Sequence, residues 1–146
     1  MELRISTPKP ILIGREYDMT SNWKTSNDNV MNKLFAVACS QKTLVKTSRH
    51  ATAIVNKNKI LSIGVNKLKT HPMMLNFDYV SDKKIFIHSE IDALIKVLNL
   101  WGPDILKQCE LYNLRVTNTN KIGTAKPCRG CMDAITGFKL KRVFWT

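Results

Sequence analysis

Apolar side chains recur at helical spacing in three windows of this chain, and a period of i, i+3, i+4 and i+7 places one apolar stripe on a helix. The pattern predicts a helix from about Asp28, capped by Asn27 or Asp28, a second from near His88 to Gly102, and a third that opens at Pro127. The stripes are Met31, Leu34, Phe35 and Ala38, then Ile91, Leu94, Ile95 and Leu98, then Cys131, Ala134, Ile135 and Phe138.

Between these windows the pattern changes to β-branched runs and two-residue alternation, which predict strands. A hairpin is expected from Ala51 to Val55 and from Ile60 to Val65, with residues 56–59 as its polar turn. Two more strands are expected, within residues 111–119 and at 141–146. Because a helix lies between these last two strands, they should run parallel. The order of elements predicts a three-layer α/β/α fold around a mixed central sheet.

Before the first helix, residues 1–27 contain Pro8, Pro10, Gly14 and a polar run. We expect an extended arm here, with a short strand from Ile11 to Ile13. Residues 28–146 are expected to form one domain, a length that can bury a core without disulfides. Residues 66–84 form a loop of about twenty residues, long enough to suggest a function.

Composition adds a strong positive charge: the chain has 146 residues and a formal net charge of +12 at pH 7. A basic surface attracts phosphate, so a nucleotide or a nucleic acid is a candidate partner, and a solvated Lys-rich surface is the alternative. The sequence shows no secretion signal and no apolar run long enough to span a membrane. We therefore expect a cytoplasmic protein without a membrane partner, and a homo-oligomer.

Two short motifs contain candidate metal ligands, His88-Ser89-Glu90 and Pro127-Cys128-Arg129-Gly130-Cys131. One imidazole and two thiolates supply three zinc ligands and leave the fourth tetrahedral position for water. Cys128 and Cys131 are three residues apart, so both sulfurs face the same side of a helix start, where free N–H groups favour thiolates. Cys39 and Cys109 are expected to be small apolar residues rather than disulfide partners.

The spacing favours catalysis over a closed structural site. A C-x-x-C pair alone is as often structural or redox-active, but a structural site needs a fourth ligand, and His71, Cys39 and Cys109 have no partner spacing for it. One zinc ion per chain would lower the pKa of its bound water, and Glu90 would accept the proton. Zinc-bound hydroxide and a carboxylate that moves protons suit hydrolytic deamination.

With these motifs, the sequence resembles the cytidine deaminase-like superfamily of zinc-dependent deaminases over about residues 28 to 146. The resemblance implies His88, Cys128 and Cys131 as zinc ligands and Glu90 as proton shuttle. Gly64-Val65-Asn66 is similar to the G-x-N of that family, whose Asn binds a sugar hydroxyl; the alternative is an Asn that only forms a turn. Ser89 stands where relatives usually have Ala and is expected to contribute its backbone N–H.

Within the superfamily, the helix-opening H-x-E-x-x-A is most similar to deoxycytidylate (CMP/dCMP-type) deaminases. The resemblance implies deamination of dCMP or CMP to dUMP or UMP and ammonia. Lys67, Lys69 and His71 follow Asn66 and are candidates for the 5′-phosphate, with a solvated basic loop as the alternative. Relatives usually continue into a fifth strand after the last one here. The arm from Leu3 to Ile13 is a candidate to cover that sheet edge, either within the chain or across a dimer.

Two other functions remain open. The first is a polynucleotide deaminase that acts on tRNA adenosine or single-stranded cytosine, supported by the net charge, by Lys139, Lys141 and Arg142, and by Arg129 at the expected pocket rim. The second is a non-catalytic zinc-binding module of the same fold, which would have no need of Glu90.

Overall fold

The computed structural model describes residues 9–11, 25–41, 48–69, 71–76 and 86–146. Its centre is a mixed sheet in the order β1-β6-β4-β2-β3, with β5 paired to β4. β4 and β6 run parallel, and the other pairs are antiparallel. The parallel pairing of the last two strands is thus confirmed. The strands are β1 Lys9–Ile11, β2 Arg49–Asn56, β3 Lys59–Val65, β4 Glu110–Val116, β5 Ile122–Gly123 and β6 Arg142–Trp145.

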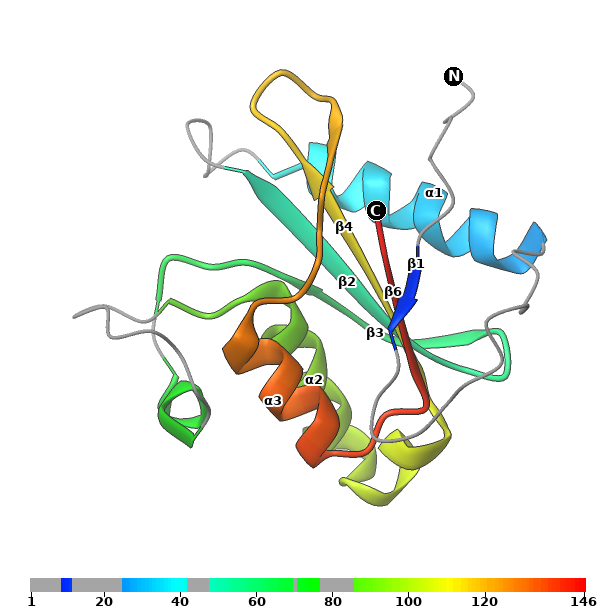
Figure 1. The fold of residues 1–146 in the computed structure, drawn as a ribbon, viewed down its shortest axis with the longest axis vertical. Coiled ribbons are helices and arrows are strands. Elements are labelled where there is room, and N and C mark those ends of the chain that lie inside the picture. The colour runs from blue at the N-terminus through cyan, green and yellow to red at the C-terminus, as the bar shows by residue number, and fades with distance from the viewer. Residues whose placement is uncertain (1–8, 12–24, 42–47, 70, 77–85) are drawn as a thin grey trace.

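Helices cover both faces of the sheet, so the expected three-layer α/β/α fold is confirmed (Figure 1). Helix α1 lies on one face, and α2 and α3 lie side by side on the other. Gly102, with φ of 79°, ends α2 as the sequence predicted. The helices are α1 Thr25–Cys39, α2 Ser89–Trp101 and α3 Arg129–Gly137, and two short 3-10 turns are η1 Pro72–Asn76 and η2 Asp104–Gln108.

Strand alternation separates two apolar cores. On β2, Ala51 and Ala53 pack towards α1, whereas Ile54 packs towards α2 and α3. On β4, Tyr112 and Leu114 belong to the α1 side. Because side chains alternate, the even-numbered residues of β2 and the odd-numbered residues of β4 share the α2 side. On this side of the sheet, the core is apolar near the end of β2 and the start of β4, and the side chains are polar towards the start of β2 and the end of β4.

Three boundaries differ from the expectations. Helix α1 begins at Thr25, so Asn27 and Asp28 lie inside the helix and do not cap it. The hairpin turn is shorter than the expected residues 56–59, because Asn56 and Lys59 still pair and Lys57 and Asn58 alone form the turn. Both have positive φ, as a two-residue type I′ turn requires. The short strand lies at Lys9–Ile11, two residues earlier than expected.

β1 pairs antiparallel with β6 and so covers the sheet edge from within the same chain. The other arm residues between Leu3 and Ile13 lie outside the described residues. Of the loop expected at 66–84, residues 70 and 77–84 lie outside the described residues; the described part contains η1, and an isolated bridge pairs Lys67 with Ile87. None of the helices in the described ranges is both long and apolar enough to cross a membrane.

Candidate metal centre and active site

His88, Cys128 and Cys131 converge on one point from two helix starts. His88 is the residue before α2 and Cys128 is the residue before α3, both with extended backbone. Their ligand atoms and Cys131 Sγ all lie within 4.8 Å of one another. His88 Nδ1 is 3.4 Å from Cys128 Sγ and 3.3 Å from Cys131 Sγ. Tetrahedral zinc with ordinary bond lengths would separate sulfur and nitrogen by about 3.6 Å, so this donor set fits zinc.

The protonation states of the ligands also suit a metal. Hydrogen bonds from Cys131 and then from His88 lower the pKa of Cys128 to about 4, against the opposing effect of burial. Cys128 is therefore a thiolate at neutral pH, the form that binds metal. The hydrogen bond with Cys128 raises the pKa of His88, and only the neutral form of the imidazole coordinates a metal.

Glu90 lies in the first turn of α2, two residues after His88, and is 4% exposed. Burial is the largest influence on its carboxyl and raises its pKa, although its hydrogen bonds oppose the shift. A buried carboxyl with a raised pKa holds and releases protons closer to neutral pH. Glu90 is therefore suited to general acid and base catalysis beside the metal ligands.

A buried row of side chains supports the Glu90 carboxyl. Ser89 Oγ is 2.9 Å from Glu90 Oε1, Thr52 Oγ1 is 2.8 Å from Ser89 Oγ, and Asn113 Oδ1 is 2.7 Å from Thr52 Oγ1. Asn113 Nδ2 in turn donates to the carbonyl of Ala125, which lies in the segment that leads to Cys128. The row thus joins α2, β2 and β4 to the second metal-ligand motif.

The Ser89 hydroxyl can serve both protonation states of Glu90. When Glu90 is a carboxylate, the Ser89 hydroxyl donates to it. When Glu90 is a carboxylic acid, the hydroxyl rotates, its oxygen accepts the Glu90 proton, and its own proton points towards Thr52. Asn113 Oδ1 only accepts, so it can end the row in either case. The Ser89 side chain is therefore part of the site. The expected contribution of its backbone N–H stays a prediction.

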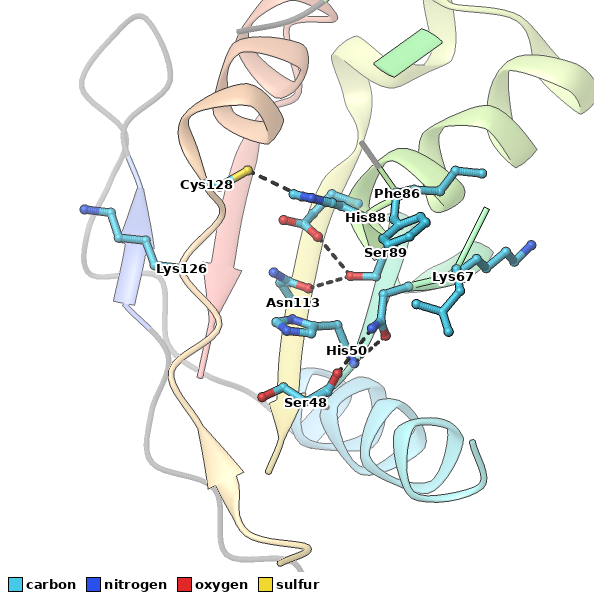
Figure 2. Close-up of a pocket in the computed structure, with 13 residues that line it drawn as sticks. Ser48, His50, Lys67, Phe86, His88, Ser89, Asn113, Lys126 and Cys128 are labelled. Atoms are coloured by element: carbon cyan, nitrogen blue, oxygen red, sulfur yellow. Dashed lines mark hydrogen bonds between the residues drawn. The ribbon is translucent and has the colours of Figure 1, made fainter. Parts of the chain in front are cut away.

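A cavity of about 400 Å³ contains this site. Figure 2 shows Cys128 and His88 at one end of it and Ser48 at the other, with Ser89, Asn113 and His50 between them. Its described lining consists of Ser48, His50, Asn66, Lys67, Leu68, Phe86, Ile87, His88, Ser89, Glu90, Asn113, Lys126 and Cys128. The volume is within the range of small-molecule sites.

Asn66 lines this cavity, and its neighbours fix its position. Its Oδ1 accepts from the backbone N–H of His50 at 2.9 Å, and its Nδ2 donates to the carbonyl of Ser48 at 3.2 Å. Asp92 holds the residues on either side, through the N–H of Val65 at 3.0 Å and Lys67 Nζ at 2.9 Å. The amide can still offer one donor and one acceptor to a ligand.

The four basic residues expected near the substrate do not form a cluster. Lys67 lines the cavity, but its ammonium is paired with Asp92, which also contacts Lys96 at 3.2 Å. Lys69 is exposed, and His71 Nδ1 accepts from the N–H of Met73; neither is among the described lining residues.

Arg129 was expected at the pocket rim, and it is not among the described residues that line the cavity. It lines a separate hollow together with Met132, Asp133 and Thr136 of α3. The physical reason is the helix period: Cys128 and Cys131 define the inward face, and the residue that follows Cys128 points elsewhere.

His50, Ser48, Asn113 and Lys126 line the cavity and were missed by sequence reasoning. Asn113 lies within the strand expected at residues 111–119, but its place in the lining of the site was not expected. His50 and Ser48 precede an apolar run, so alternation along β2 was the one signal that could have placed them beside Thr52. Burial, then Arg115 and His88, lower the pKa of His50 to about 4, so its imidazole is neutral at pH 7.

Comparison with known families agrees with this geometry. A family model described as the cytidine and deoxycytidylate deaminase zinc-binding region matches residues 24–146. A comparison with curated proteins found no match. The matched region contains the three metal ligands, Glu90 and the cavity around them. The chain therefore belongs to the cytidine and deoxycytidylate deaminase family and is a zinc-dependent deaminase.

Proposed function

We propose that the chain deaminates a cytosine nucleotide, dCMP or CMP, to dUMP or UMP with release of ammonia. The observation that carries this proposal is the position of Glu90, buried next to the three zinc ligands and on the wall of a cavity with room for a small molecule. A non-catalytic zinc module would not need a buried, supported carboxyl at this point.

His88, Cys128 and Cys131 would hold the zinc ion, which would act as a Lewis acid and lower the pKa of the attacking water. Glu90 takes a proton from the attacking water and delivers it to the ring nitrogen next to the amino-bearing carbon. It then moves the second proton to the departing amino group. One carbon–oxygen bond forms, one carbon–nitrogen bond breaks, and Glu90 returns to its starting protonation state.

The charges around the cavity support a free nucleotide over a polynucleotide. The basic run from Lys139 to Arg142 leads into the start of β6, where Arg142 faces Glu110 at the start of β4, with 4.0 Å between charged atoms. The site side chain of Asn113 lies farther along β4. That run is therefore at the other end of the strand pair and offers no basic path to the metal ligands.

The test is ammonia release by the zinc-loaded chain from dCMP, CMP, deoxycytidine and dGMP, run beside single-stranded DNA and tRNA with sequencing as readout. We expect dCMP or CMP to be the best substrate. Exclusive turnover of DNA or tRNA would replace the proposal with the polynucleotide function.

Glu90→Gln is the matched variant, because it keeps the shape of the side chain and removes its acid–base function. It should retain zinc and lose activity by at least 10²- to 10⁴-fold, the usual contribution of such a group. Full turnover by this variant would contradict the role of Glu90.

A further inference from the structure

The cavity continues along β2, away from the metal ligands. Ser48, His50 and Thr52 alternate with residues that face α1, so they point to the same side of the sheet. Thr52 contacts Ser89 beside Glu90. At about 3.3 Å per residue, His50 lies about 7 Å and Ser48 about 13 Å from Thr52 along the strand direction. The Asn66 side chain lies beside Ser48 and His50, because it makes hydrogen bonds with the backbone of both.

This remote end of the cavity has a fixed cation behind it. Arg115 is the cross-strand partner of His50, and its Nε donates to Ser48 Oγ at 2.9 Å. Because Ser48 Oγ accepts this N–H, its own proton can be donated to a ligand. The neutral imidazole of His50 can donate a hydrogen bond as well, and Lys126 adds an exposed ammonium to the lining.

Acidic side chains in the described lining of the cavity lie only at the opposite end. Among the described residues that line the cavity, Glu90 is the one carboxylate, and it is next to the zinc ligands. The loop that was expected to bind phosphate is less suitable, because the Lys67 ammonium is already paired with Asp92. The cavity is therefore polarised along its length: the acid lies at the metal end, and the Ser48 hydroxyl and the His50 imidazole lie at the other end, with the Arg115 guanidinium behind them.

We propose that Ser48 and His50, backed by Arg115, form the subsite for the 5′-phosphate of the nucleotide. This inference rests on the proposed function: with the base at Glu90 and the sugar at Asn66, the phosphate is the group that reaches Ser48. Charge-assisted hydrogen bonds from this end would distinguish a nucleotide from a nucleoside.

The experiment compares kcat/KM for dCMP with kcat/KM for deoxycytidine, using the full zinc-loaded chain. Arg115→Gln should lower this ratio roughly 10- to 100-fold, mainly through KM for dCMP, since a hydrogen bond to a charged group contributes about this factor. Ser48→Asp, which places a negative charge in the subsite, should lower it at least as far. Lys107→Gln on η2 removes one exposed positive charge elsewhere and should leave the ratio at the wild-type value.

A wild-type ratio in Arg115→Gln would overturn the subsite, and so would a ratio that falls in Lys69→Gln and not in Arg115→Gln. If Arg115→Gln loses zinc or fails to fold, the ratio is measured in Ser48→Asp instead, and a wild-type ratio in that variant would overturn the subsite.

Binding of the products separates failure of the subsite from failure of the proposed function. If the wild type turns over neither dCMP nor deoxycytidine, the proposed function fails. Calorimetry then tests the subsite by comparing the affinity for dUMP with the affinity for deoxyuridine in the wild type and in the same variants. If the wild type and Ser48→Asp show the same preference for dUMP, the subsite is refuted. If Ser48→Asp loses the preference for dUMP that the wild type shows, the subsite is supported.

Discussion

Gly64 controls how closely helix α2 approaches the sheet. A Cβ at this position would lie 2.3 Å from both Ala93 N and Ser89 O, and 2.9 Å from Ala93 Cα. Those first two atoms are the donor and acceptor of a hydrogen bond in the first turns of α2. They belong to the backbone, so no side-chain rotation relieves the collision. Gly64→Ala should therefore push this part of α2 away by about 1 Å.

That displacement acts on the site because His88 and Glu90 lie at the same end of α2. Overpacking of this kind costs about 1 to 3 kcal/mol, which for a chain of this size lowers Tm by roughly 3 to 12 °C. A misplacement of about 1 Å at catalytic groups reduces the rate on the order of 100-fold. We expect Gly64→Ala to show both effects, together with a lower zinc content, measured by thermal unfolding, deaminase kinetics and metal analysis.

Gly137→Ala is the matched control, because a Cβ there meets nothing within 4 Å and the residue ends helix α3. Its Tm, zinc content and kcat should equal those of the wild type or exceed them slightly, since Ala favours a helix. If Gly64→Ala were as stable and as active as Gly137→Ala, the inferred contact between β3 and α2 would be wrong.

Two further predictions concern the metal centre. Ser89→Ala removes the hydroxyl that contacts Glu90 and leaves Thr52 paired with Asn113. The variant should retain zinc, and its kcat should fall up to about tenfold. An unchanged kcat would show that the hydroxyl does not position the Glu90 carboxyl. Zinc affinity should fall as pH falls from 8 to 6, because zinc and a proton compete for His88, whose pKa is raised. Competition with a chelator at several pH values measures the zinc affinity. An affinity that does not change with pH would contradict the prediction.

Local sequence signals predicted most of the fold because they report on local physics. The helical stripes, the β-branched runs and the Gly102 stop each identify an element without reference to the rest of the chain. The first turn of α1 was missed because it precedes the apolar stripe that marks the helix. β5 was missed because two residues carry no period.

The metal ligands were predictable because their spacing is itself the chemical requirement. The cavity floor was not, because it depends on register between distant strands. His50 acquires its place opposite Arg115 only when β2 pairs with β4. Lys67 appeared available for phosphate in the sequence, and its pairing with Asp92 arises from packing of α2 against the end of β3.

The pairing of β1 with β6 has a consequence for the order of folding. Lys9–Ile11 meets Val143–Trp145, so about 130 residues separate the two strands along the chain. During synthesis β1 emerges before β6 and cannot form this pairing until β6 has followed it. Closing so large a loop is slow in comparison with forming the hairpin of β2 and β3. We therefore expect this edge to be completed last, after the zinc ligands have already come together.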